Sequence, residues 1–417
     1  MNLDMNEQFS HALRTIEHTD KSVFITGRAG TGKSTLLQYF RDNTQKNIAV
    51  IAPTGVAAVN IKGQTLHSFF NFKPDVTPDS VKKIRPKTKE LYKKIDTIVI
   101  DEVSMLRADL MDCVDRFLRI YGKHKGLPFG GTQMVFIGDL YQLPPVVTSR
   151  EREMLKTLYK SPYFFSSHVF ENGFPFEFIE LQKIYRQSDE VFIRILNSIR
   201  NNTITDEDIE IINRRYHPDF QDEKDFYVYL TTTNDVADSI NSMKLQSIDG
   251  KLYSYEAIVG GNFNLKDLPT SLDLKIKKGA QVMLLNNDPY GRWINGSIGI
   301  IVDIERHNRS EDSIIVEIQG GEEVEVQIYT WEMYEFKYDK GKEGIKAEVV
   351  GTFSQYPLKL AWAITIHKAQ GMTFDRVIID IGKGTFSHGQ LYVAFSRCRT
   401  LEGLVIKQPV KKQHILM

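Results

Sequence analysis

The chain has 417 residues, of which 41% are apolar and 25% charged, an ordinary composition for a folded protein of two to three domains. This composition excludes disordered, collagen-like and coiled-coil classes. Basic and acidic residues number 53 each, so no overall positive field attracts polyanions, and any site for them must be local.

The two cysteines, Cys113 and Cys398, exclude a disulfide framework and a cysteine-rich zinc site and suit a reducing compartment. The N-terminus has neither the basic start nor the apolar run of a signal peptide, and no stretch of about 18 apolar residues occurs. We therefore expect a cytoplasmic protein without a targeting segment and without contact with a membrane.

A phosphate-binding loop follows the first predicted strand, residues 21–27, and opens a helix. Gly27, Gly32, Lys33 and Ser34 match the G-x-x-x-x-G-K-[ST] pattern in the strand-to-helix context that it requires. Glycines let backbone N–H groups surround a phosphate, the lysine neutralises its oxygens, and the serine hydroxyl holds Mg²⁺. The alternative is a glycine-rich turn with an exposed lysine. The predicted nucleotide-binding residues here are Gly27, Ala29, Gly30, Thr31, Gly32, Lys33, Ser34 and Thr35.

A buried strand, predicted for residues 97–100, ends in two acids, Asp101 and Glu102. Many strands end in acids, but downstream of a phosphate loop both motifs belong to the carboxyl edge of one parallel sheet, where ligands bind. We expect Asp101 to bind Mg²⁺ and Glu102 to polarise the attacking water.

The next predicted strand, residues 133–138, leads to Gln142, Pro144 and Pro145 at the same edge. There a neutral amide can hydrogen-bond either a γ-phosphate or the attacking water. A turn stiffened by two prolines, with Gln142 merely exposed, explains the residues equally well.

The remaining residues indicate a second α/β sheet with an insertion. From residue 251 to 350 the helical period gives way to alternation, with a hairpin signal at Gly320-Gly321, which predicts a small all-β barrel or sandwich. The second sheet is predicted from the short apolar runs at residues 176–181, 226–230 and 376–380, with helices at 189–200 and 390–397.

Polar donors gather after an apolar run near the C-terminus, at Thr365, His367, Lys368 and Gln370. Such a loop suits a phosphate backbone, although a lone histidine is more often structural. Arg397 closes the last helix, where it either answers the helix dipole or reaches a nucleotide bound in the other domain as an arginine finger.

Seven segments in order resemble the motifs of superfamily I DNA helicases in the Pif-type, RecD-like branch: GRAGTGKST, APTGVAA with TLHSFF, DEVSM, GDLYQLPP, YRQ, AITIHKAQGMTFDRVI and QLYVAFSRCR. The resemblance implies an α/β fold of two RecA-like P-loop NTPase domains with parallel sheets. It further implies ATP and Mg²⁺ as cofactors and 5′-to-3′ movement on single-stranded DNA that unwinds forked or structured DNA, in a minimal, bacterial-type motor that is monomeric in isolation and nucleoid-associated. The expected parts are a first domain at 1–168 with a small wedge insertion at 62–96, a second domain at 169–250 and 351–417, and the all-β insertion at 251–350.

The same resemblance assigns roles to single residues. Gln8 would read the adenine edge, Gln142 would sense the γ-phosphate, and Arg186 and Arg397 would reach across the cleft, with Gly371 beside the nucleotide. The residues that would line the DNA track are Thr54, Gly55, Val56, His67, Ser68, Phe69, Pro144, Thr365, His367 and Lys368.

The expected wedge is locally basic, with nine lysines and arginines and four acids over residues 62–96. A solvated helix face explains such a run equally well. We expect DNA contacts through the backbone and by stacking, with little sequence preference. A DNA-stimulated translocase that cannot separate strands shares every catalytic residue with a helicase, whereas a small-molecule kinase leaves the second domain unexplained.

Overall fold

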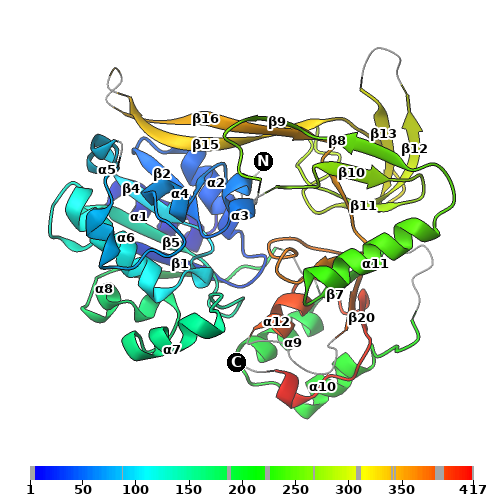
Figure 1. Ribbon diagram of the computed structural model, residues 1–417. Helices are drawn as coiled ribbons and strands as arrows, with labels where there is room; N and C mark the ends of the chain where they lie inside the picture. Colours follow the sequence, from blue (N-terminus) through cyan, green and yellow to red (C-terminus); the bar gives the residue numbers. More distant parts are fainter. Residues whose placement is uncertain are drawn as a thin grey trace.

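The computed structural model describes residues 5–86, 88–185, 189–220, 226–265, 268–306, 311–339, 341, 344–380 and 389–415. The first domain is built on a parallel sheet in the order β3-β2-β4-β5-β1-β6 (Figure 1). Its central strands are buried on both faces, which is why they read as unbroken apolar runs. The strands are β1 (Val23–Gly27), β2 (Ile48–Ala52), β3 (Gln64–Thr65), β4 (Thr97–Ile100), β5 (Gln133–Ile137) and β6 (Glu177–Leu181).

Alternate residues of these strands enter two separate cores. Val23 and Ile25 of β1 pack with α1 and α2, whereas Phe24 faces the opposite core, where Phe117 of α6 lies. The helices of this domain are α1 (Glu7–His18), α2 (Lys33–Asn43), α3 (Gly55–Asn60), α4 (Leu66–Phe70), α5 (Lys89–Lys94), α6 (Ala108–Tyr121), α7 (Ser149–Leu158) and α8 (His168–Glu171).

The second domain carries a four-stranded parallel sheet in the order β18-β7-β19-β20. Its strands come from distant parts of the chain, because the all-β insertion separates β7 from β18. The elements are β7 (Val228–Thr231), β18 (Ala363–Thr365), β19 (Val377–Ile379) and β20 (Leu404–Ile406), with α9 (Glu190–Arg200), α10 (Asp206–Asn213), α11 (Asn234–Ser247) and α12 (Gln390–Phe395).

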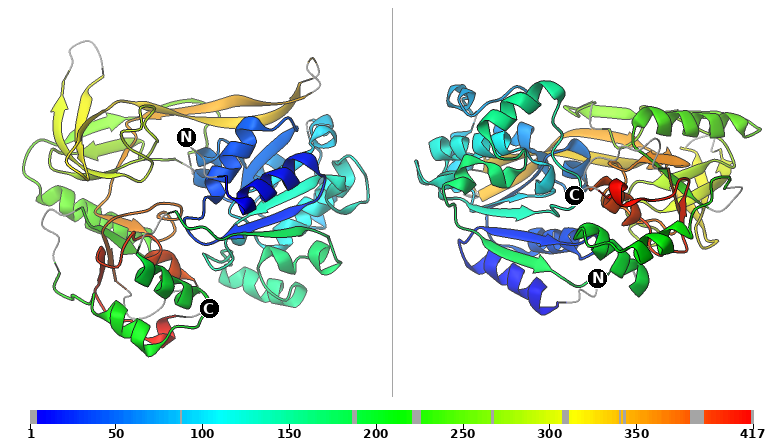
Figure 2. Two further views of the ribbon diagram at one scale, coloured as in Figure 1. Left: turned by 180° about the vertical axis from the view of Figure 1, so that it is seen from behind. Right: turned by 90° about the horizontal axis from the view of Figure 1, so that it is seen from below.

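The insertion forms three antiparallel sheets, and its long β15–β16 hairpin extends from the second domain over the first (Figures 1 and 2). The hairpin is fixed there because Phe336 N donates to Gln64 Oε1 at 3.0 Å and Ile345 N donates to Asn47 Oδ1 at 3.1 Å. Its strands are β8 (Tyr253–Glu256), β9 (Ile258–Gly261), β10 (Asp273–Ile276), β11 (Gln281–Leu284), β12 (Ile298–Glu305), β13 (Ser313–Ile318), β14 (Glu323–Val326), β15 (Tyr329–Asp339), β16 (Gly344–Gln355) and β17 (Leu358–Leu360).

Two predicted boundaries are wrong. Strand β6 was expected in the second domain, but it pairs in parallel with β1, so the first domain continues beyond residue 168 to at least Leu181. Strand β17 pairs with β11, so the insertion continues beyond residue 350 to at least Leu360. In both cases the sequence indicates a strand but not its partner. Among the described helices, none is long and apolar enough to cross a membrane.

Candidate functional site

The phosphate loop connects β1 to α2 as predicted. Gly27 has no room for a side chain, because a Cβ there would lie 2.5 Å from Thr31 Oγ1. Gly30 and Gly32 adopt the left-handed φ angles 82° and 87° that glycine tolerates best. Lys33 Nζ donates to the carbonyl oxygens of Gly27 at 2.6 Å and Arg28 at 3.1 Å, so its ammonium lies inside the loop. Ser34 and Thr35 are exposed in the first turn of α2.

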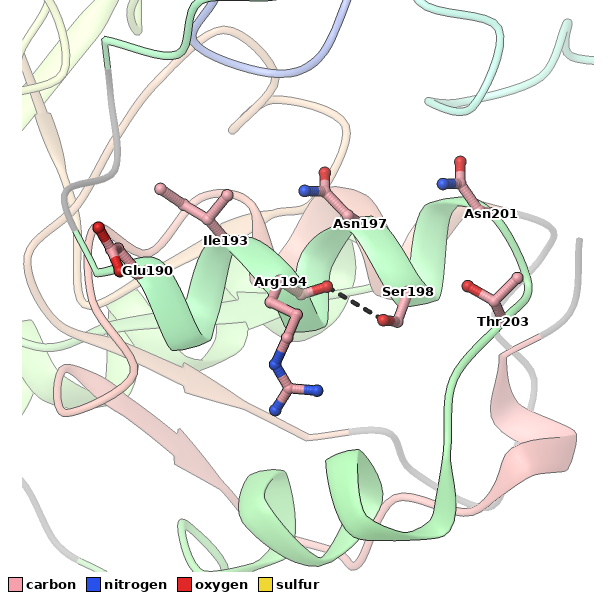
Figure 3. A pocket seen from close by; sticks show the side chains of 7 residues that line it. All are labelled: Glu190, Ile193, Arg194, Asn197, Ser198, Asn201 and Thr203. Atoms are coloured by element: carbon pink, nitrogen blue, oxygen red, sulfur yellow. Dashed lines mark hydrogen bonds between the residues drawn. The ribbon is translucent and has the colours of Figure 1, made fainter.

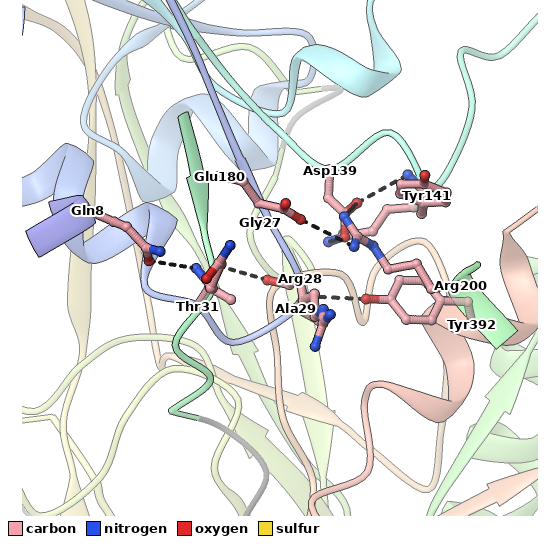
Figure 4. A network of polar contacts seen from close by, with 12 residues as sticks. Gln8, Gly27, Arg28, Ala29, Thr31, Asp139, Tyr141, Glu180, Arg200 and Tyr392 are labelled. Atoms are coloured by element: carbon pink, nitrogen blue, oxygen red, sulfur yellow. Dashed lines mark hydrogen bonds and ion pairs between the residues drawn. The ribbon is translucent and has the colours of Figure 1, made fainter. Parts of the chain in front are cut away.

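Gln8 of α1 lies beside this loop (Figure 4), where its Oε1 accepts from Gln182 N at 3.0 Å. The amide is thereby fixed against the end of β6, at the rim of the loop.

Asp101 and Glu102 follow β4 at the same sheet edge. Burial and the neighbouring Glu102 raise the pKa of Asp101 to about 7, and Lys33 partly opposes the shift. Burial also raises the pKa of Glu102, while Lys33 and Arg397 lower it. Glu102 has a left-handed φ of 49°, which orients this residue at the turn after the strand. Buried Asp101 and half-buried Glu102 lie close to Lys33 and form an acidic cluster that favours a positive ligand.

Gln142 is buried rather than exposed, which removes the alternative of a solvent-facing turn residue. Its Nε2 donates to Asp139 Oδ2 at 3.2 Å. Its Oε1 accepts from Gln370 Nε2 of the second domain at 3.3 Å, and the same Gln370 nitrogen donates to Glu102 Oε2 at 2.9 Å. The two domains thus meet directly at the acidic cluster.

Two further residues of the second domain contact the first, and sequence reasoning missed both (Figure 4). Arg200, at the end of α9, is 5% exposed and lies 3.6 Å from Asp139 Oδ1 and 3.5 Å from Glu180 Oε1. Tyr392 of α12 accepts a hydrogen bond at its hydroxyl from the phosphate-loop amide of Ala29, at 3.4 Å. Each resembles an ordinary amphipathic helix position, so only the tertiary structure identifies it.

Arg397 is 1% exposed. Its guanidinium donates to the carbonyl oxygens of Val393 at 3.0 Å, Met372 at 3.2 Å and Ala369 at 3.4 Å, all in its own domain. The Val393 contact fits the helix-end interpretation. The positive charge of Arg397 also lowers the pKa of Glu102 in the first domain. Arg186 lies outside the described residues.

The first-domain residues expected to face DNA divide into a group that solvent reaches and a group that is buried. The Thr54 hydroxyl accepts from Ala57 N and caps α3, and the half-buried His67 and exposed Ser68 lie on α4. Phe69 is 4% exposed and packs edge-to-face with Phe70. The prediction of a DNA contact is therefore wrong for the Phe69 side chain, because the phenylalanines of this segment, Phe69, Phe70 and Phe72, are all buried in one core. Gly55 is buried at the start of α3, the Val56 side chain is not described, and Pro144 is half-buried.

In the second domain, the turn after β18 presents exposed His367 and Lys368. Thr365 is 4% exposed, and its Oγ1 accepts from Lys368 N at 3.3 Å, so it holds the turn. Gly371 ends the turn with a left-handed φ of 81°. A separate hollow lies along the outer face of α9, between Glu190 and Thr203 (Figure 3), and contains no predicted site residue.

Comparisons with known proteins agree on one family. A model described as PIF1-like helicase matches residues 3–210, and one described as UvrD-like helicase C-terminal domain matches residues 360–405. The ATP-dependent DNA helicase Pif1 of Bdellovibrio bacteriovorus is 33% identical over 92% of this chain and 83% of its own length. The human ATP-dependent DNA helicase PIF1 is 32% identical over 96% of this chain, which spans only 60% of the human protein.

Solved structures of Pif1 from Bacteroides sp are similar over the whole chain. The complex with ADP-AlF4 has a TM-score of 0.90 at 37% identity and covers 100% of this chain and 95% of its own. The same helicase bound to ssDNA has a TM-score of 0.67 at 36% identity, with the same coverage of both chains. These likenesses confirm the predicted fold of two RecA-like domains.

Proposed function

Because the chain belongs to the PIF1-like helicase family, we propose that it is an ATP-dependent DNA helicase that moves 5′ to 3′ on single-stranded DNA and separates duplex or structured DNA. The observation that carries the proposal is the direct contact of the two motor domains at the acidic cluster, through Gln370, Glu102 and Gln142. A small-molecule kinase has no need of a second domain at that place.

ATP is proposed to bind between the domains, with its phosphates in the loop at Lys33 and its adenine beside Gln8. Glu102 polarises the attacking water and Gln142 senses the γ-phosphate. Arg397 and Arg186 would approach from the second domain, with Gly371 beside the nucleotide.

Mg²⁺ is proposed to bind at Ser34 and Asp101. The acidic cluster, in which Asp101 is buried, fits a cation, and one carboxylate with one hydroxyl suits an ion that keeps waters and takes its other ligands from phosphates. When bound, the ion neutralises charge on the phosphates.

DNA is proposed to cross both domains, over Thr54, Gly55, Val56, His67, Ser68 and Pro144 in the first and Thr365, His367 and Lys368 in the second. In the proposed wedge, residues 62–96, Lys73, Lys82, Lys83 and Lys89 are exposed, as phosphate contacts require. Single-stranded and forked DNA are the proposed partners, in keeping with the structure of Bacteroides Pif1 bound to ssDNA and with a Pif1 structure that describes DNA unwinding at forked dsDNA.

A strand-displacement assay with and without ATP tests the proposal. A helicase releases the displaced strand only with ATP. ATP hydrolysis stimulated by single-stranded DNA, without release of that strand, would indicate the translocase instead. Hydrolysis indifferent to DNA would contradict both.

A further inference from the structure

Gln370 connects two proposed sites. It belongs to the turn that is proposed to face DNA, and its side chain contacts Glu102, the proposed general base. It follows exposed His367 and Lys368 by only a few residues, yet its side chain points the other way, into the cleft. Its Nε2 donates to Glu102 Oε2 at 2.9 Å and to Gln142 Oε1 at 3.3 Å. This one amide nitrogen thus donates to two groups of the first domain.

The turn that carries Gln370 is internally braced. Ala369 N donates to Thr365 O at 2.9 Å and Gln370 N donates to His367 O at 3.2 Å. The Arg397 guanidinium holds the carbonyl oxygens on both sides of Gln370, those of Ala369 and Met372. Because of these bonds, a displacement of His367 or Lys368 carries Gln370 with it.

The hydrogen bond has a chemical consequence for Glu102. A carboxylate oxygen that accepts an amide N–H is a weaker proton acceptor than a free one, and the bond fixes the orientation of the whole carboxylate. Glu102 is therefore restrained in this conformation by a residue of the other domain.

We infer that Gln370 is a positioning residue that restrains the Glu102 carboxylate until bound DNA moves the turn. ATP hydrolysis is therefore slow without DNA. The inference rests on the proposed function. DNA phosphates that contact Lys368 draw the turn outward, the Gln370 amide leaves Glu102 Oε2, and the freed carboxylate accepts the proton of the attacking water.

The test is ATP hydrolysis by Gln370→Met, in which a side chain of similar length has no donor, measured with and without single-stranded DNA. We expect the DNA-independent kcat to rise about tenfold, the size expected when a hydrogen bond to a charged group is lost. The kcat with DNA and the KM for ATP should each stay within about twofold, so the stimulation factor falls. Gln246→Met, the same change at an exposed position of α11, should leave all of these values unchanged.

Equal losses of kcat with and without DNA would overturn the inference, because they would mean that the amide assists Glu102. Unchanged rates would overturn it as well. If Gln370→Met does not fold, Gln370→Asn, whose shorter side chain falls short of Glu102, is tested against the same expectations. Wild-type hydrolysis that DNA does not stimulate would contradict the proposed function itself. Failure of the proposed function is thereby distinguished from failure of the inference about Gln370.

Discussion

The Arg200 guanidinium of the second domain lies 4.2 Å from the centre of the Tyr141 ring of the first domain. The same group pairs with Asp139, whose side chain is fully buried. This contact places a positive charge of α9 directly beside the loop that carries Gln142.

Replacing Arg200 by methionine should therefore destabilise the protein. Removal of one partner from a buried ion pair leaves the other charge uncompensated, at a cost of about 3–5 kcal/mol. Thermal unfolding of the full chain measures the effect as a lower Tm. Arg214→Met is the matched control, since Arg214 is exposed, and an equal loss of stability there would argue against a specific role for the Arg200 contact.

Lys33→Ala and Glu102→Gln should separate nucleotide binding from hydrolysis. Lys33 lies inside the phosphate loop, so its loss should weaken ATP affinity, whereas Glu102→Gln should keep ATP bound and slow hydrolysis by about 10²–10⁴-fold. Equilibrium binding of a fluorescent nucleotide and ATPase rates on single-stranded DNA give the two quantities. Normal hydrolysis by Glu102→Gln would show that another group activates the water.

Arg397→Lys should remove most DNA-stimulated hydrolysis while nucleotide affinity stays within a few-fold. A guanidinium at a transferring phosphoryl group is worth about 10³–10⁵ in rate, and lysine does not reproduce its planar fork. Because Arg397 also donates to Val393 O, Tm is measured in parallel with turnover. A lower Tm with normal turnover per folded molecule would leave Arg397 as a helix-end residue.

His67→Ala should weaken binding of single-stranded DNA by about 1–3 kcal/mol without changing ATP affinity in the absence of DNA, because its half-buried ring is the proposed stacking surface. Fluorescence anisotropy at several salt concentrations measures this, and log affinity should fall linearly with log salt. His18→Ala, at an exposed position of α1, is the control. Binding that does not respond to salt would contradict a phosphate-dominated interface.

The sequence predicted the placement of residues whose spacing is local. The phosphate loop, the acids after β4 and Gln142 lie at one sheet edge because each directly follows a parallel strand. Long-range pairing was not predictable in the same way, since β6 has the same short apolar pattern in either sheet. The orientations of the Phe69 and Gln370 side chains were not predictable either, because composition does not reveal which face of a short helix or turn is buried.

The 5′-to-3′ helicase activity is tested by the unwinding of two duplexes, one with only a 5′ single-stranded tail and one with only a 3′ tail, at saturating ATP. We expect efficient strand displacement on the 5′-tailed duplex, none without ATP, and little on the 3′-tailed duplex. Efficient displacement on the 3′-tailed duplex, or equal displacement in the absence of ATP, would contradict an ATP-dependent helicase that moves 5′ to 3′.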